Sequence, residues 1–277
     1  MQFLAATCPK CSGALQIPAE LSVVKCMYCG VDVVTKEASS GPSVANLLEV
    51  AEAAFVSGNY REAFDRYGEA LALDPTNAKA WLNKGFSAGW QSKVDGDRVP
   101  EMMTLVAKAV TAAPETEKKA LRVEGARGIN AVCVALNNLV QKRLAEYVAL
   151  DNTWGEHLAT CRVLFAGYEA AHALDPENKV VMENIVLLAT DCLGGVEYRD
   201  IYHSKSILRH MVSGQRAEEL RAIVGRYTVK IRKLDPVYSA PVPAKPDESS
   251  GARTFGMLAL GALILFCIIF VAVKCNS

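Results

Sequence analysis

The chain has 277 residues, 51% hydrophobic and 22% charged, which excludes global disorder and allows one large core or two smaller ones. Its 30 basic residues balance 30 acidic ones, so no global attraction to nucleic acid is indicated. Nine cysteines, an odd number, argue for a reducing compartment rather than a disulfide scaffold. Because the first residues run into Cys8 without a secretory apolar region, we expect the bulk of the chain in the cytosol.

Two Cys-x-x-Cys pairs lie near the start of the chain: Cys8 with Cys11, and Cys26 with Cys29. Each pair in a tight turn directs two thiolates at one ion, and two such turns complete the tetrahedral S4 site that suits zinc. Four cysteine ligands leave no open position for a catalytic water, so we expect one structural zinc ion. Gly13 and Gly30 follow the pairs and are expected to supply a positive φ.

Short strands are expected around these pairs, over residues 14–17, 21–25 and 31–35. Residues 1–37 therefore resemble a zinc ribbon. Ribbons often contact nucleic acid, but the local charge here is balanced, and phosphate binding needs a clustered basic excess. The charged residues of the segment are Lys10, Lys25 and Lys36 against Glu20, Asp32 and Glu37. Protein docking, or capping of the next segment of the chain, is the better interpretation.

A helical hairpin is predicted after a short linker at residues 38–43. Ser43 can cap a first helix over 44–57, and a second follows over 60–73 before Asp74-Pro75 stops it. A third helix begins after Asn77. Small, aromatic, turn and stop residues recur at the spacing of a tetratricopeptide repeat, which this segment resembles. They are Ala51, Gly58, Tyr60, Ala63, Tyr67, Ala70 and Pro75, followed by Trp81 and Gly85.

One such repeat cannot bury its own apolar face, so we expect a mainly α fold with a helical-repeat body, an α-solenoid, over residues 44–234. The repeat pattern is lost at residues 94–100. Helical periodicity resumes over 101–113 and again over 115–150, with a break expected around Gly125 and Gly128.

A second repeat end is indicated by internal similarity. The eleven residues from Tyr67 to Asn77 align without a gap with those from Tyr168 to Asn178, and both contain Leu-Asp-Pro. A helix is therefore expected up to Leu174, with Asp151–Thr153 as its cap. A further helix is expected over 179–193, closed by Gly194-Gly195.

Residues 214–234 carry apolar positions alternately three and four apart. Such a seam is either the capping helix of the solenoid, which we favour, or a coiled-coil contact in a homodimer. The seam consists of Ala217, Leu220, Val224, Tyr227, Ile231 and Leu234.

A Pro-rich tether is predicted at residues 235–254, followed by nineteen uncharged residues at 255–273. That length approaches the ~20 residues a helix needs to cross a bilayer. The topology resembles a tail anchor: a single-pass membrane protein with its N-terminal bulk on the cytoplasmic side.

No catalytic constellation is recognised, and we do not expect an enzyme. His157 and Cys161 are one helical turn apart, but two ligands without a third are more often core or surface residues. Cys133, Cys161 and Cys192 are interpreted as small buried hydrophobes.

The tetratricopeptide resemblance implies a protein or peptide binder that uses the first helix of each repeat. Positions that clamp chaperone C-termini in that family correspond to Leu48, Glu52 and Asn83, of which only Asn83 matches. Chaperone binding is thus disfavoured. We hypothesise a more apolar groove of Leu48, Glu52, Phe55, Trp81, Asn83 and Phe86.

The leading hypothesis is a membrane-anchored interaction scaffold that recruits a cytosolic protein. The alternative is a membrane-held regulatory zinc-ribbon protein that contacts nucleic acid. A third is an enzyme with His157 and Cys161 in its site, which would need a second bound metal.

Overall fold

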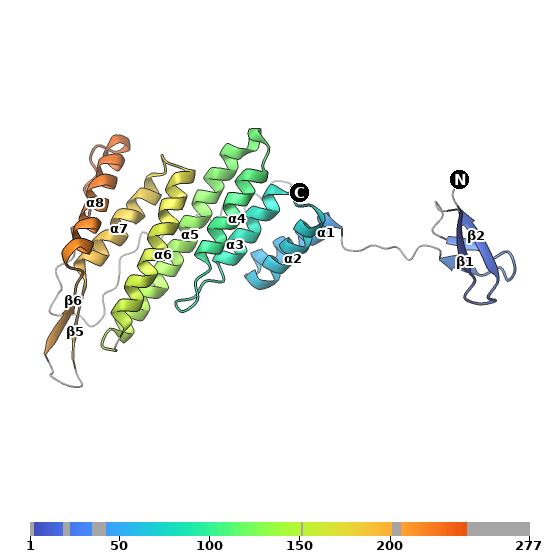
Figure 1. Ribbon diagram of the computed structural model, residues 1–277, viewed down its shortest axis with the longest axis horizontal. Helices are drawn as coiled ribbons and strands as arrows, with labels where there is room; N and C mark the ends of the chain where they lie inside the picture. Colours follow the sequence, from blue (N-terminus) through green and yellow to red (C-terminus); the bar gives the residue numbers. More distant parts are fainter. Residues whose placement is uncertain (1–2, 19–22, 35–42, 151, 201–205, 243–277) are drawn as a thin grey trace. The chain divides into compact units, whose positions relative to one another are not determined.

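The computed structural model describes residues 3–18, 23–34, 43–150, 152–200 and 206–242 of the chain (Figure 1). It divides into two units, residues 1–47 and residues 48–277. The first holds paired strands and the second holds paired helices, so the mainly α fold with a small β region at the N-terminus is confirmed.

The first unit contains two antiparallel hairpins. Strand β1 (Phe3–Thr7) pairs with β2 (Ala14–Pro18), and β3 (Val23–Lys25) pairs with β4 (Asp32–Val34). The turn of each hairpin carries one of the two cysteine pairs. A small core consists of Cys8, Leu15, Ile17, Cys26 and Val33. The strands after each cysteine pair lie where the pattern predicts, whereas β1 was not predicted.

The second unit is built of α-helices that follow one another side by side in chain order (Figure 1). The described helices are α1 (Val44–Val56), α2 (Tyr60–Leu73), α3 (Ala78–Gly89), α4 (Val99–Ala112), α5 (Glu115–Tyr147), α6 (Thr153–Leu174), α7 (Lys179–Gly194) and α8 (Gly214–Leu234). The most extensive packing joins α3 to α4, α5 to α6 and α7 to α8. Each helix buries one face against its neighbours, and most of the buried apolar residues form a single core.

The corners at the ends of α2 and α6 have nearly the same backbone. Asp74 ends α2 at φ −134° and ψ 86°, and Asp175 ends α6 at φ −136° and ψ 84°. The next helix starts in each case on an Asn, Asn77 or Asn178, whose side chain accepts from the amide three residues on. Helix α8 also ends in Leu-Asp-Pro, at Asp235 with φ −141° and ψ 91°. The repeated residues therefore encode a repeated corner.

Helix α5 is continuous through Gly125 and Gly128, so the break expected there was wrong. A Cβ at Gly128 would lie 2.1 Å from the ring of Phe86, and one at Gly125 would lie 2.8 Å from Val106. The two glycines allow α3 and α4 to approach α5, and this packing outweighs the weak helix propensity of glycine.

Between α7 and α8 lies a hairpin that was not predicted, β5 (Val196–Arg199) with β6 (Ile207–His210). Helix α8 then packs on α7. Its seam residues Ala217, Leu220, Tyr227 and Ile231 are buried within the chain, in keeping with the capping interpretation. A homodimer through 214–234 stays a prediction and would have to use another face of this helix.

The predicted tether begins by packing on the helices. Asp235 accepts a hydrogen bond from Lys179 at 2.7 Å, and Tyr238 and Ala240 contact the main core. No helix within the described residues is long and apolar enough to cross a membrane. The predicted span at 255–273, like the tether from 243 onward, lies outside those residues.

Candidate metal centres

Each cysteine pair of the ribbon lies in a turn closed by the same two backbone hydrogen bonds. In the first turn the Cys8 amide donates to Gly13 and the Ser12 amide donates to Cys8. In the second, Cys26 donates to Val31 and Gly30 donates to Cys26. The left-handed residues are Ser12, at φ 58°, and Gly30, at φ 72°. The positive φ of Gly30 was predicted. In the first turn the positive φ was expected at Gly13, but it lies at Ser12.

The four sulfur atoms converge on one point. Sγ of Cys8 lies 3.6 Å from Sγ of Cys29, and Sγ of Cys11 lies 3.7 Å from Sγ of Cys26. All four lie within 4.8 Å of one another. A tetrahedral zinc ion with Zn–S bonds of about 2.3 Å separates its sulfur ligands by about 3.8 Å. The predicted ligands Cys8, Cys11, Cys26 and Cys29 are thus brought together with the spacing that zinc requires.

A backbone hydrogen bond prepares one thiol of this cluster for a cation. Cys8 and Cys26 are buried in the ribbon core, while Cys11 is exposed. The backbone amide of Cys11 donates to Cys8 and helps to lower the pKa of that thiol to about 6. A thiol with a lowered pKa is more readily available as the thiolate that binds metal.

The second turn also exposes two large apolar side chains, Met27 at 78% and Tyr28 at 65%. Both lie between the ligands Cys26 and Cys29. The ring of Tyr28 covers Gly13 on the first turn, where a Cβ would lie 2.5 Å from it. The tip of the ribbon thus presents an apolar surface beside the metal ligands.

The residues of the hypothesised groove fall into two groups. Leu48, Phe55 and Trp81 pack around one small cluster with Ala51, Ala54, Ala63, Tyr67, Leu71 and Ala80. Trp81 donates from Nε1 to the carbonyl of Pro75 at 2.9 Å, and Lys108 lies 4.9 Å from its ring centroid. These apolar side chains contribute mainly to the packing of α1, α2 and α3.

Phe86 packs instead against Gly128 of α5, in the main core. Asn83 donates to the hydroxyl of Tyr67 at 3.2 Å, and Glu52 is exposed on α1. The groove stays a prediction, and Glu52 and Asn83 are its members with polar atoms available for a ligand.

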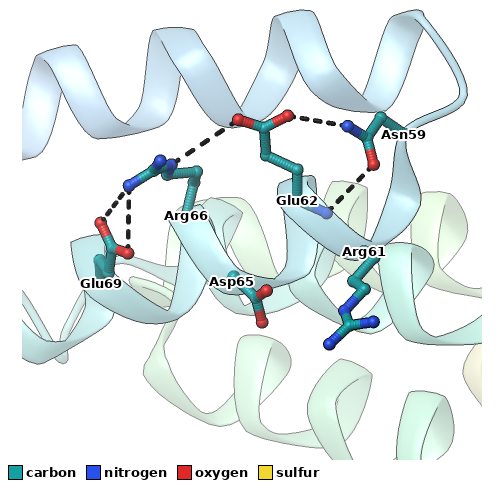
Figure 2. Close-up of a pocket in the computed structure, with 6 residues that line it drawn as sticks. All are labelled: Asn59, Arg61, Glu62, Asp65, Arg66 and Glu69. Atoms are coloured by element: carbon teal, nitrogen blue, oxygen red, sulfur yellow. Dashed lines mark hydrogen bonds and ion pairs between the residues drawn. The ribbon is translucent and has the colours of Figure 1, made fainter.

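A shallow depression runs along α2, the second helix of the α1–α2 pair (Figure 2). Its side chains pair mostly with one another. Arg66 bonds both oxygens of Glu69 and lies 3.9 Å from Glu62, which also accepts from Asn59. Because these charges are mutually satisfied and exposed, the depression makes a weak ligand site. It is lined by Asn59, Arg61, Glu62, Asp65, Arg66 and Glu69.

A second group of ligand atoms lies inside the helical body. His157 and Cys161 of α6 meet Cys192 of α7, with all three ligand atoms within 4.8 Å of one another. Cys161 and Cys192 are buried, as predicted, but the expectation that His157 and Cys161 lack a third ligand was wrong. Cys161 and Cys192 are equally far in sequence from the turn at Pro176–Glu177, so an antiparallel hairpin places them opposite each other. These equal distances from the turn are the sequence signal that could have predicted the third ligand.

No protein-family model and no curated protein sequence matches this chain. Its geometry defines a body of paired helices and an N-terminal four-cysteine cluster consistent with a zinc ribbon. The four-cysteine group and the His157–Cys161–Cys192 group could each bind a metal ion.

Proposed function

We propose that this chain is a protein-interaction scaffold whose paired helices bind a cytosolic protein or peptide. The observation that carries the proposal is the recurrence of one corner, at Asp74, Asp175 and Asp235, along a series of neighbouring helices. Stacked helix pairs present an extended surface, and tetratricopeptide-like proteins use it for binding. The resemblance of residues 44–77 to such a repeat points the same way.

The zinc ribbon serves in this proposal as a structural module that also docks a protein. Met27 and Tyr28 offer exposed apolar area at its tip, which suits a protein surface. Binding to phosphate would instead require a clustered basic excess. Lys10 and Lys25 are the described lysines of this unit, and Lys25 pairs in register with Asp32.

Recruitment to a bilayer completes the proposal. The apolar residues 255–273 would anchor the chain, with its N-terminal bulk on the cytoplasmic side. The mechanism would be a raised local concentration of the bound partner rather than chemistry on it.

Proximity labelling with the full-length chain tests the scaffold, because it marks any protein that comes close to the chain. Glu52→Lys reverses an exposed charge on α1, the face hypothesised to bind. Glu69→Lys makes the same change on α2 and is the matched control. We expect Glu52→Lys to remove specific partners that wild type and Glu69→Lys retain. Identical partner sets for all three proteins would contradict binding at this surface.

A salt-dependent association of the full chain with RNA or DNA, weakened by Lys10→Ala with Lys25→Ala, would instead replace the scaffold by the nucleic-acid alternative.

A further inference from the structure

The His157–Cys161–Cys192 cluster lies in the interior of the helical body, remote in sequence from the ribbon. His157 and Cys161 project from successive turns of α6, and Cys192 comes from the last turns of the antiparallel α7. Their exposures are 4%, 1% and 2%. An imidazole this buried rarely lacks a partner for its nitrogens, so the grouping needs a physical explanation.

The spacing of the cluster is that of metal ligands. Nε2 of His157 lies 3.5 Å from Sγ of Cys161. A tetrahedral zinc ion with bonds of about 2.1 Å to nitrogen and about 2.3 Å to sulfur separates those two ligand atoms by about 3.6 Å. Residues four apart on a helix share one face, so the first two ligands need no distortion of α6.

Charged groups of both signs interact with the cluster. Asp191, the neighbour of Cys192 in the chain, interacts electrostatically with Cys192 and His157. Arg216 is the cationic side chain that interacts with both thiols. Nδ1 of His157 is buried and has no hydrogen-bond partner among the described residues. A divalent ion bound by Nε2 and the two sulfur atoms would neutralise the thiolates, and the imidazole would keep its proton on Nδ1.

A column of stacked rings covers the cluster and fixes its imidazole. Trp154 stacks on His157 at 5.3 Å between centroids, His210 of β6 stacks on Trp154 at 5.9 Å, and Tyr198 of β5 stacks on His210 at 5.1 Å. The β5–β6 hairpin therefore packs, through His210, onto the helix that bears two of the ligands. Such an apolar cover limits the access of water and orients the His157 ring.

We propose that His157, Cys161 and Cys192 bind a second zinc-class metal ion, which cross-links α6 to α7. Two thiolates and one imidazole are a ligand set that zinc accepts, and the fourth position is filled by water. The ion holds the last helix pairs together beneath the β5–β6 hairpin. This proposal is independent of the scaffold function. It concerns a metal ion in the interior of the helical body, whereas the scaffold binds a partner on its surface.

A disulfide between Cys161 and Cys192 is the competing explanation. The structure has both as free thiols, and the disulfide would leave His157 Nε2 without its thiol partner. The cysteine content also indicates a reducing compartment. Metal binding accounts for all three residues, whereas the disulfide accounts for two.

Metal counting on the reduced full-length chain tests the proposal. We expect about two zinc ions per chain in wild type, and about one in Cys192→Ala. Cys133→Ala is the matched control, because Cys133 is an equally buried cysteine of the same core outside the cluster, and it should retain both ions. One ion in wild type, or no loss in Cys192→Ala, would overturn the second site.

Cobalt binding gives a test that does not depend on folding of the Cys192 variant. A variant with Cys8→Ser, Cys11→Ser, Cys26→Ser and Cys29→Ser has no ribbon thiols and leaves the helical body unchanged. Titrated with Co²⁺, it should bind one equivalent, with thiolate charge-transfer bands and the visible absorption of tetrahedral cobalt. The absence of these bands in fully reduced protein would overturn the proposal, and a Cys161–Cys192 linked peptide in a digest of the unreduced chain would establish the disulfide.

Discussion

The two sulfur clusters of this chain differ in what brings their ligands together. In the ribbon, each pair of cysteines is set by one tight turn, so Cys8 with Cys11 and Cys26 with Cys29 are readable from spacing alone. In the body, Cys192 reaches His157 and Cys161 only because α7 folds back on α6. A local motif announces its chemistry in sequence, whereas a site assembled by helix packing does not.

The clusters also differ in how much of the surrounding fold depends on them. The ribbon core consists of a few side chains, too few to stabilise a domain of this size without a metal. The helical body has a large apolar core that joins residues from α3 to α8. We therefore expect loss of metal to unfold the ribbon and only to loosen the body.

The largest effect is expected for Cys8→Ser with Cys26→Ser. Removing two thiolates abolishes a structural zinc site that contributes on the order of 10 kcal/mol to folding in isolated zinc modules. The ribbon should lose the protection of its β1–β4 amides from hydrogen exchange, while the helices retain theirs. If the β1–β4 amides stay protected without metal, the claim that the ribbon fold depends on its zinc site is contradicted.

A smaller effect is expected for Gly167→Ala, which tests the packing that positions α6. A Cβ there would lie 2.5 Å from Sγ of Cys133 and 3.2 Å from Val99. Overpacking of this kind costs about 1–3 kcal/mol, more than the helix propensity that alanine restores. Gly155→Ala on the same helix is the control, since its Cβ meets nothing within 4 Å.

In chemical denaturation, Gly155→Ala should be stabilised by about 0.5–1 kcal/mol, because alanine favours the helix and loses less backbone entropy. Equal effects of the two substitutions would contradict the close approach of α6 to α5.

The smallest effect concerns His172, which lies on the same helix as His157 but faces a lysine. Lys230 donates to its Nε2 at 2.8 Å, and Tyr227 packs edge-on at 5.3 Å. Burial, and then the charge of Lys230, lowers the pKa of His172. The remaining charged groups that influence it are Glu169, Arg226 and Asp175.

Because the folded pKa lies below the unfolded value of about 6.5, the unfolded chain takes up the proton first as the pH falls. The contribution of neutral His172 to the free energy of unfolding is complete above that unfolded value, and it is lost as the pH falls through the folded pKa. Denaturation midpoints at fixed metal concentration should show a weaker pH dependence in His172→Gln. An unchanged slope would contradict this assignment.

Sequence reasoning predicted the features that depend on neighbouring residues. The cysteine turns, the Asp-Pro corners and the bounds of α2 and α8 follow from caps and stop residues, and the structure has them there. The predicted break at Gly125 and Gly128 was wrong because it considered only the local preference of glycine. Glycine is a poor helix former locally, but Phe86 and Val106, far away in sequence, require the space it leaves.

The remaining omissions have the same origin. The strands β5 and β6 have four residues each, half of their side chains are exposed, and β6 shows no alternating pattern, so their pairing could not be inferred. The partnership of Cys192 with Cys161 depends on equal numbers of residues between each cysteine and the turn that joins α6 to α7. Tertiary packing, rather than local preference, determines both features.

Hydrogen exchange of the full-length chain, with and without chelation of metal, tests the central claim most directly. Two metal centres predict faster exchange in two places, the ribbon hairpins and the α6–α7 segments around Cys161 and Cys192. The corner between α2 and α3, which has no thiols, should be unchanged and serves as the internal reference. Faster exchange in the ribbon alone would contradict a second metal centre in the helical body.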